Sequence, residues 1–431
     1  MILRRSLPHP FVFLLAGALG WNSLAAAPAA TSTETIAKPS VKVIRFEDLK
    51  PDDARLTTCW DGVGIDGEQR VYIALSDQSD KHPFDTIIFR YDTRTGGRER
   101  LATLREISRN DGNLLPGETI AKTHVGFHEH DGKFYFSSHD YHQYEGAIDL
   151  AKRRGGHIYS YDLTTGTFSD LSKGDAGGIS VAQQGIIGLS VMPKQNKLAG
   201  ITFPFGDIVI HDLKSGTTRF YQGVDRHRKR GKPSRQIFST DSGKVYFSYY
   251  DSRPAPMYVF DLATEKITET PYRYNFGMIY GALRTKDGQR IYLVDTFGTL
   301  YVFHTADERL EQLGSLLPPD QIEAGITVRT CYAMALSSDE SRLYTFPSRL
   351  SVAPALRVYE YEVASGKRRQ VADFTAEING SSGTVGGEDR NGRITGAGVI
   401  DDQGRMYFGY HESGDDGRNG ALLQVSLPTP R

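Results

Sequence analysis

A strand-like motif that recurs seven times is the feature that most constrains the fold of this chain. Each copy begins with a basic residue, continues as an alternating strand, and usually has tyrosine at its third position. The copies start at Arg70, Lys133, Lys197, Lys244, Arg290, Arg342 and Arg405, so successive copies are 46 to 64 residues apart. That period fits one four-stranded antiparallel blade with insertions in its loops. The repeat therefore predicts an all-β fold, a seven-bladed β-propeller.

Turn signals around the motif support four strands per copy. A turn such as Asp131-Gly132 precedes the motif, and a third strand follows that ends in a pair such as Tyr161-Asp162. A second turn, such as Thr165-Gly166, then leads into a fourth strand. The 23 Tyr, 21 Phe and 45 Gly of the chain also favour many short strands joined by turns.

The two ends of the repeat predict how the ring closes. The last copy, residues 397–427, contains three strands, and the segment Val41–Leu49 at the other end is a strand without a partner. Pairing this segment with the last blade removes the sheet edge that an open array would expose. We therefore expect residues 41–431 to form a single propeller closed by an N-terminal strand.

The first residues predict export. Arg4 and Arg5 precede an apolar run from Phe11 to Trp21, and Ala25-Ala26-Ala27 offers small residues for cleavage. We expect residues 1–27 to be a signal peptide and residues 28–40 a linker, which predicts a secreted or periplasmic protein with no membrane attachment after cleavage. The net charge of -1 gives no reason to expect nucleic acid as a partner.

One face of the predicted propeller gathers the residues whose side chains are suited to catalysis or binding. The loops entering the inner strands share this face with the ends of the second strands, and polar groups from all blades converge there. His124 and His139 of the second blade are expected to face each other across adjacent strands, and a basic run, residues 225–232, leads into Arg235. The catalytic candidates are His124, His139, Arg235, Tyr250 and Tyr280. The substrate-binding candidates are His142, Arg228, Arg230, Arg253, Arg329 and Arg349.

Histidine, tyrosine and arginine without paired acids suit β-elimination of a uronic acid. Arginine or histidine neutralises the uronate carboxylate, a histidine or tyrosine removes the C5 proton, and a second one protonates the leaving O4. A glycoside hydrolase would need two carboxylates, and the predicted face offers no such pair. The predicted partner is an anionic polysaccharide, which a basic loop would attract.

The segments HVGFHEHDGKFYFSSH, GGHIYSYDLTTGTFSDL and SRQIFSTDSGKVYFSYYD, from the second to the fourth blades, resemble the seven-bladed polysaccharide lyases that cleave ulvan. The resemblance implies a lyase that requires no cofactor for catalysis and in some members carries a structural zinc. We expect the protein to be a monomer. It implies that His124 and His139 are the two histidines of the second blade, with Arg235 as the carboxylate neutraliser. Phe203 departs from the resemblance, because a tyrosine is expected there; Tyr250 or Tyr280 would take its role.

Two other functions fit the same features. One is a metal-dependent oligogalacturonate lyase, which metal dependence of the activity would reveal. The other is a non-catalytic periplasmic propeller that binds a glycan or a protein.

The two cysteines present a separate question. Cys59 and Cys331 begin the inner strands of the first and sixth blades, which should place them too far apart for a disulfide. With His411 of the seventh blade they would begin a zinc site. The alternative is that both are buried thiols that pack as small hydrophobic side chains.

Overall fold

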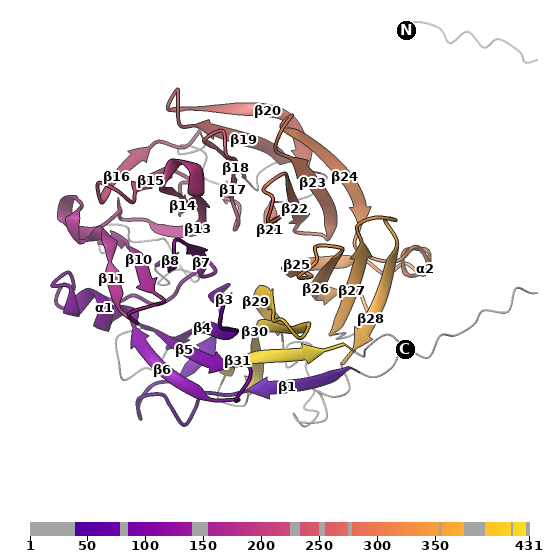
Figure 1. Ribbon diagram of the computed structural model, residues 1–431, viewed down its shortest axis with the longest axis horizontal. Helices are drawn as coiled ribbons and strands as arrows, with labels where there is room; N and C mark the ends of the chain where they lie inside the picture. Colours follow the sequence, from indigo (N-terminus) through magenta and orange to yellow (C-terminus); the bar gives the residue numbers. More distant parts are fainter. Residues whose placement is uncertain are drawn as a thin grey trace, which may run out of the picture. The chain divides into compact units, whose positions relative to one another are not determined.

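The structure is a computed structural model that describes residues 39–77, 85–139, 154–224, 233–249, 255–274, 278–352, 356–374, 393–414 and 417–427. Over these residues, seven antiparallel sheets stand in a ring around a central axis (Figure 1). The predicted seven-bladed β-propeller is confirmed.

In each blade the chain generally runs from the axis outward through four paired strands. The first blade adds a short strand, β3, to one strand of its sheet and consists of β2 (Leu56–Thr58), β3 (Val63–Ile65), β4 (Arg70–Asp77), β5 (Asp85–Asp92) and β6 (Arg98–Thr103). The second contains β7 (His128–His130), β8 (Lys133–Ser137), β10 (Ile158–Asp162) and β11 (Phe168–Asp170). A small sheet beside it pairs β9 (Gly155–Gly156) with β12 (Val181–Ala182).

The next three blades repeat this order without additions. The third contains β13 (Gly185–Met192), β14 (Lys197–Phe203), β15 (Ile208–Asp212) and β16 (Thr217–Tyr221). The fourth contains β17 (Phe238–Ser239), β18 (Lys244–Ser248), β19 (Ala255–Asp261) and β20 (Lys266–Tyr274). The fifth contains β21 (Ile279–Arg284), β22 (Arg290–Asp295), β23 (Thr299–His304) and β24 (Arg309–Ser315).

The last two blades and a few helical turns complete the ring. The sixth blade contains β25 (Val328–Leu336), β26 (Arg342–Leu350), β27 (Arg357–Glu362) and β28 (Arg368–Asp373). The seventh combines β1 (Ser40–Ile44) with β29 (Arg393–Ile400), β30 (Arg405–Gly414) and β31 (Gly417–Ser426). Two short helices, α1 (Leu104–Asn110) and α2 (Pro319–Glu323), lie at the periphery of the ring (Figure 1). Among the described residues, 3-10 helices occur at Leu171–Gly174, Ala176–Gly178 and Pro193–Gln195.

The recurring motif has a physical basis that the first blade shows. Strand β4 begins at Arg70, whose Nε donates to the Asp66 carboxylate at 2.6 Å, and the Tyr72 hydroxyl donates to the same carboxylate at 3.0 Å. Each of the other second strands also begins at the basic residue of its copy. In the first and seventh blades, the basic residue and the tyrosine therefore fasten the second strand to the turn before it.

The ring closes as the sequence predicts. Strand β1 pairs antiparallel with β31, with Ser40 opposite Ser426 and Ile44 opposite Leu422. The first and last strands of the described chain thus lie side by side in one blade (Figure 1). Ile44 packs with the first blade, and Val43 packs against the core of the seventh, so this strand contributes to the hydrophobic clusters on both of its faces.

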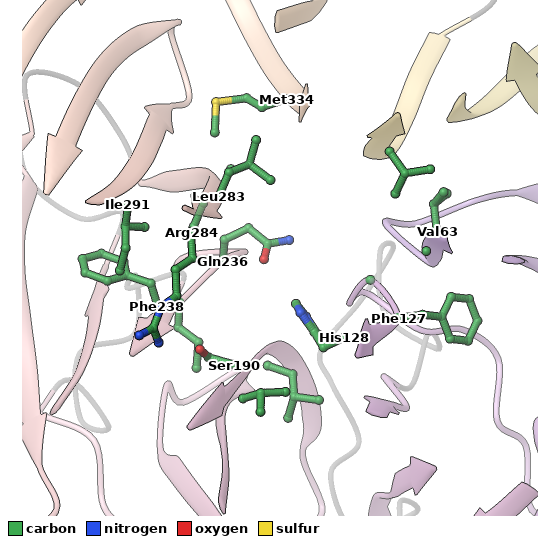
Figure 2. A pocket seen from close by; sticks show the side chains of 18 of the residues that line it. Val63, Phe127, His128, Ser190, Gln236, Phe238, Leu283, Arg284, Ile291 and Met334 are labelled. Atoms are coloured by element: carbon green, nitrogen blue, oxygen red, sulfur yellow. The ribbon is translucent and has the colours of Figure 1, made fainter. Parts of the chain in front are cut away.

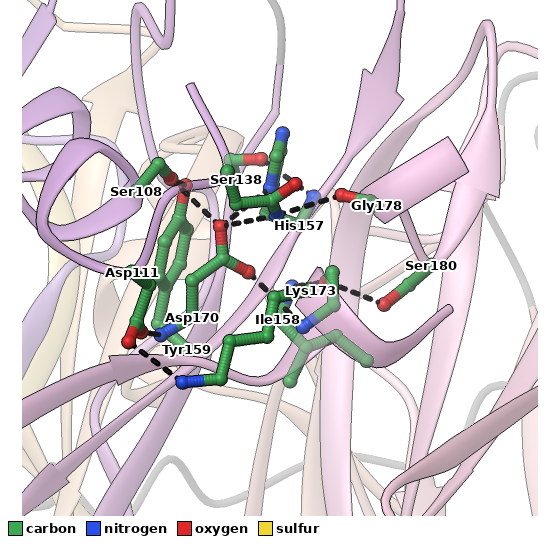
Figure 3. A network of polar contacts seen from close by, with 12 residues as sticks. Ser108, Asp111, Ser138, His157, Ile158, Tyr159, Asp170, Lys173, Gly178 and Ser180 are labelled. Atoms are coloured by element: carbon green, nitrogen blue, oxygen red, sulfur yellow. Dashed lines mark hydrogen bonds and ion pairs between the residues drawn. The ribbon is translucent and has the colours of Figure 1, made fainter. Parts of the chain in front are cut away.

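A buried ionic network ties α1 to the second blade (Figure 3). The His157 ring lies between two carboxylates, with Nδ1 2.9 Å from Asp170 and Nε2 3.1 Å from Glu118. Asp170 also accepts a hydrogen bond from Ser108 of α1 at 2.8 Å, and Arg154 pairs with Glu118 at 2.9 Å. Burial alone would lower the pKa of His157, but the hydrogen bonds and negative charges of Asp170 and Glu118 outweigh burial and raise it. The network therefore favours the imidazolium form, which donates to both carboxylates.

This network predicts a pH-dependent contribution to stability. Folding raises the pKa of His157. The contribution of its imidazolium to the free energy of unfolding is therefore fully present below the unfolded-state pKa, and it is lost as pH rises through the folded-state pKa. His157→Gln should cost about 3 kcal/mol of unfolding free energy at mildly acidic pH, the scale for removing one partner of a buried pair. Urea unfolding of both proteins between mildly acidic and alkaline pH should show this difference shrinking as pH rises. His304→Gln, at a half-exposed ion pair with Glu311, is the control and should change little; a pH-independent effect of His157→Gln would contradict the prediction.

Candidate functional site

Aromatic and charged side chains from six blades meet at one end of the central channel. The turn before β3 supplies Trp60 and Asp61, the loop before β7 supplies Lys122 and His124, and His139 follows β8. Strand β14 ends at Phe203, Arg235 precedes β17, and strands β21 and β25 supply Tyr280 and Tyr332. We call this group the channel-mouth cluster; its members are Trp60, Asp61, Lys122, His124, His139, Phe203, Arg235, Tyr280 and Tyr332.

The two predicted histidines are in contact. The His124 and His139 rings lie 4.7 Å apart, centroid to centroid, in an edge-to-face arrangement. The His139 backbone N–H donates to the Lys122 carbonyl oxygen at 2.7 Å, which fixes the loop before β7 against the end of β8. The ring centroids of Trp60 and His124 lie 5.2 Å apart, and those of Phe203 and His139 lie 5.3 Å apart.

His124 is held in its neutral form. It is fully buried, and this burial together with the positive charges of Lys122 and Arg235 and the neighbouring His139 lowers its pKa well below the ordinary value. Within the described ranges, neither ring nitrogen of His124 has a hydrogen-bond partner. A neutral imidazole with an available nitrogen can accept a proton from a ligand.

Arg235 occupies an aromatic cage. Its guanidinium carbon lies 4.9 Å from the Tyr332 ring centroid, 5.4 Å from that of Tyr280 and 6.0 Å from that of Trp60. A second cation, the Lys122 ammonium, lies 4.3 Å from the Trp60 ring centroid. Cation–π contacts of this kind hold a charge in place while leaving it attractive to anions.

Burial raises the pKa of both Tyr280 and Asp61. The pKa of Tyr280 is raised chiefly by burial, against an opposing effect of Arg235. The pKa of Asp61 is raised to about 7 by burial, and here too the charge of Arg235 opposes the shift. Tyr280 therefore keeps its proton at neutral pH and can donate it.

The cluster has a buried base and a more accessible rim. Lys122, His124, His139 and Asp61 are buried. Trp60, Phe203, Arg235 and Tyr332 are half-buried and therefore accessible to solvent. A ligand would first meet these aromatic rings and the guanidinium.

Close backbone approach fixes the first blade against the second. A Cβ atom on Gly62 would lie 2.7 Å from the Ala74 Cβ and 2.9 Å from the Thr123 Cγ2, and one on Gly64 would lie 2.6 Å from the Phe127 Cβ. The Phe127 N–H also donates to the Val63 carbonyl at 3.1 Å. The turn that carries Trp60 and Asp61 is thus held directly against the loop that carries Lys122 and His124.

A cavity of about 430 Å³ adjoins the cluster. Figure 2 shows some of the residues that line this cavity. Tyr280 and Tyr332 line both the cavity and the cluster. The lining is mostly apolar, with Val63, Leu283 and Met334 among its members, while His128 and Gln236 point into the open space (Figure 2). Burial lowers the pKa of His128 to about 4, so its ring is neutral at physiological pH.

The remaining predicted site residues fall into two groups. Arg329 and Arg349 are exposed on β25 and β26 of the sixth blade. The other five lie outside the described residues; they are His142, Arg228, Arg230, Tyr250 and Arg253.

The proposed zinc ligands do not come together. Cys59 and Cys331 are free, buried thiols that belong to two different hydrophobic clusters. Burial raises the pKa of both thiols, that of Cys331 to about 12. His411 is buried in β30. In the part of the chain that the structure describes, no three His, Cys, Asp or Glu side chains are placed to hold a metal ion.

Sequence reasoning identified four of the nine members of the cluster as catalytic candidates, namely His124, His139, Arg235 and Tyr280. Trp60, Asp61, Lys122 and Tyr332 were not predicted to be site residues. Lys122 and His124 stand two positions apart, and Trp60 directly follows Cys59 at the predicted start of an inner strand. Their positions close to His124 and Cys59 in the strand register were therefore the available signal for Trp60, Asp61 and Lys122.

Comparisons with known proteins place the chain by its fold. No family model matches it, and no curated protein matches its sequence. In the described ranges no helix has the length and apolar character needed to cross a membrane.

Two solved structures resemble the whole propeller. A chain from a structure titled "Crystal Structure of Mitotic Checkpoint Complex" aligns with a TM-score of 0.50 at 10% identity, covering 96% of this chain and 100% of that one. The β-propeller domain of Cps50 (Swd1) from Myceliophteria thermophila aligns with a TM-score of 0.51 at 12% identity, covering 90% and 100%. At such identities the likeness shows the fold alone, and it does not indicate the ulvan-cleaving lyases in particular. The chain is a seven-bladed β-propeller.

Proposed function

We propose that this protein is a secreted or periplasmic polysaccharide lyase that cleaves a uronic-acid-containing anionic polysaccharide, such as ulvan, by β-elimination. The observation that carries the proposal is the contact between two histidines, one of them held neutral, beside a guanidinium and a protonated tyrosine. These are the three kinds of group that the reaction requires.

Each step can be assigned to a side chain of the cluster. Arg235 binds the uronate carboxylate, which makes the C5 proton more acidic and stabilises the charge that develops when it leaves. His124 or His139 accepts this proton as a neutral base. Tyr280 donates its proton to O4 as the bond between C4 and O4 breaks, which leaves a double bond between C4 and C5. The proposal requires no cofactor.

The single carboxyl group among the described residues of the cluster favours elimination over hydrolysis. A glycoside hydrolase uses two carboxyl groups on either side of the scissile bond. Among the described residues of the cluster, Asp61 is the one carboxyl group, and burial raises its pKa. The cluster as described thus lacks the second acid.

Incubation with anionic polysaccharides tests the proposal. The double bond formed by elimination absorbs in the ultraviolet, so we expect absorbance to rise with ulvan or a related polyuronate and not with a neutral polysaccharide. Arg235→Met should lower the rate about 100-fold by removing the group that stabilises the developing charge. Arg219→Met, at an exposed ion pair with Glu265, is the matched control and should act like the wild type. Absence of absorbance change with every polyuronate would refute the proposal, and full loss of activity in a chelator would favour the metal-dependent oligogalacturonate lyase.

The burial of both histidines favours a second candidate function. His124 is fully buried and His139 is 3% exposed, so a ligand could be held by the rim residues without reaching the histidines. The protein would then bind an anionic glycan and leave it intact. Calorimetric binding of a polyuronate whose chain length stays constant during prolonged incubation would identify this function.

A further inference from the structure

The cavity beside the channel-mouth cluster has the size and shape of a small-molecule site. Its volume is about 430 Å³, within the range found for ligand pockets. Strand β21 lines it from Tyr280 to Arg284, and a strand segment of that length extends about 13 Å. A molecule built on two fused rings can therefore lie along this strand.

The lining favours a ligand without charge. Glu129 and Arg284 are the carboxylate and the guanidinium among the described residues that line the cavity. Glu129 is exposed to solvent, and the Arg284 guanidinium forms an ion pair with Asp241. Each of these charges is thus already solvated or paired. Because a charge moved from water into a mostly apolar cavity needs a partner there, an uncharged molecule fits this lining best.

Two polar side chains give the cavity hydrogen-bonding groups. His128 points into it from the second blade, and Gln236 points into it from the segment before β17 of the fourth blade (Figure 2). The Nε2 atom of His128 is buried and has no hydrogen-bond partner among the described residues, and Gln236 is buried as well. A buried polar atom without a partner is costly, so a ligand that bonds to Nε2 removes a penalty that the empty cavity carries.

A hydroxyl group matches both side chains. The His128 ring is neutral because burial lowers its pKa, and a neutral imidazole accepts or donates at Nε2 according to its tautomer. The Gln236 amide has one accepting and one donating end. A hydroxyl group donates and accepts, so it fits either tautomer and either end of the amide. A carboxylate or an ammonium group would bring a charge that these two neutral groups do not balance.

We propose that this cavity binds a small uncharged molecule with an apolar body and a hydroxyl group, an alcohol or a phenol, whose hydroxyl bonds to His128 and Gln236. The apolar body packs against the aliphatic side chains of the lining. Arg235, which binds the uronate in the proposed function, does not line the cavity. The inference therefore concerns a second site and does not rest on the proposed function.

Titration of the full chain with 2-naphthol tests the inference. This probe is uncharged at neutral pH, is fluorescent and carries one hydroxyl group on an apolar double ring. We expect a Kd below ~1 mM, a modest affinity for a probe of this size. His128→Leu removes the ring nitrogens and should raise the Kd about fivefold, the effect of losing one hydrogen bond. His128→Trp fills the space into which His128 points and should abolish binding.

Two control variants locate the bound probe. His130→Leu makes the same replacement on the same strand, at a residue that is not part of the lining, and should bind 2-naphthol as the wild type does. Arg235→Met removes the guanidinium from the aromatic cage and should also keep the wild-type Kd. Fluorescence titration measures the Kd of each variant, and calorimetry measures the number of molecules bound.

The outcomes decide the inference independently of polysaccharide cleavage. A higher Kd in His128→Leu with wild-type values in both controls supports it, even where no polyuronate is cleaved. A wild type that does not bind 2-naphthol would overturn it, as would equal Kd values in His128→Leu and His130→Leu. Loss of binding in Arg235→Met would place the probe in the aromatic cage and would also overturn it. If His128→Trp does not fold, Gln236→Trp fills the cavity from the other side and should abolish binding.

Discussion

His124→Ala and His139→Ala should each lower the rate of polysaccharide cleavage at least ~100-fold, the usual scale for losing a general acid or base. Both rings lie in one buried pair beside Arg235, and His124 is neutral because burial and its charged neighbours lower its pKa. The rate should therefore persist to a lower pH than an ordinary histidine would allow. Initial rates of ultraviolet absorbance change across a pH series measure both effects.

The control for this pair is a histidine of the same blade. His130 ends β7 at the turn into β8, and His130→Ala should keep the wild-type rate. His124→Gln and His139→Gln fill more of the buried space than alanine does, so a folded glutamine variant keeps the test valid if an alanine variant unfolds. A folded variant at either position with the wild-type rate would contradict the assignment of that histidine.

Removal of residues 39–47 should abolish soluble folding. Without β1 the outer edge of β31 loses its pairing partner, and the hydrophobic clusters of the first and seventh blades lose Ile44, Phe46 and Val43. An exposed strand edge beside apolar surface promotes aggregation. Soluble yield and size-exclusion chromatography measure the effect.

A chain that begins at residue 39 is the matched control and should remain soluble, because it keeps β1. A second test adds a synthetic peptide of residues 39–47 to the truncated protein during refolding, which should restore part of the soluble yield. A truncated protein that lacks β1 and still elutes as a folded monomer would show that the pairing with β31 does not close the ring.

The propeller could be predicted because its signal is local and repeated. The second strand of every blade begins at a basic residue. At Arg70 and Arg405 this residue and the tyrosine two positions later bond to the preceding turn. The predicted closing strand was correct for a similar reason, since a strand without a partner must pair with the blade that lacks one.

The site was only partly predictable, because its properties arise between blades. The contact of His124 with His139 follows from strand register within one blade, and the register also placed Arg235 on the correct face. The pKa values of Asp61 and His124 both depend on the charge of Arg235, which another blade supplies, and the sequence of a single blade does not reveal this. The register placed Cys59, Cys331 and His411 on one face, and the two thiols pack into separate hydrophobic clusters, so a zinc site at these residues stays a prediction.

The glycine contacts between the first two blades limit how this protein can be redesigned. At Gly62 and Gly64 the two blades meet with no room for a methyl group, so the side carrying Trp60 and Asp61 and the side carrying Lys122 and His124 keep a constant spacing. Phe203 and Tyr332 are half-buried and belong to other blades, so mutations that alter ligand preference are better placed there. Libraries aimed at new specificities should vary those two positions and leave residues 60–64 and 122–127 unchanged.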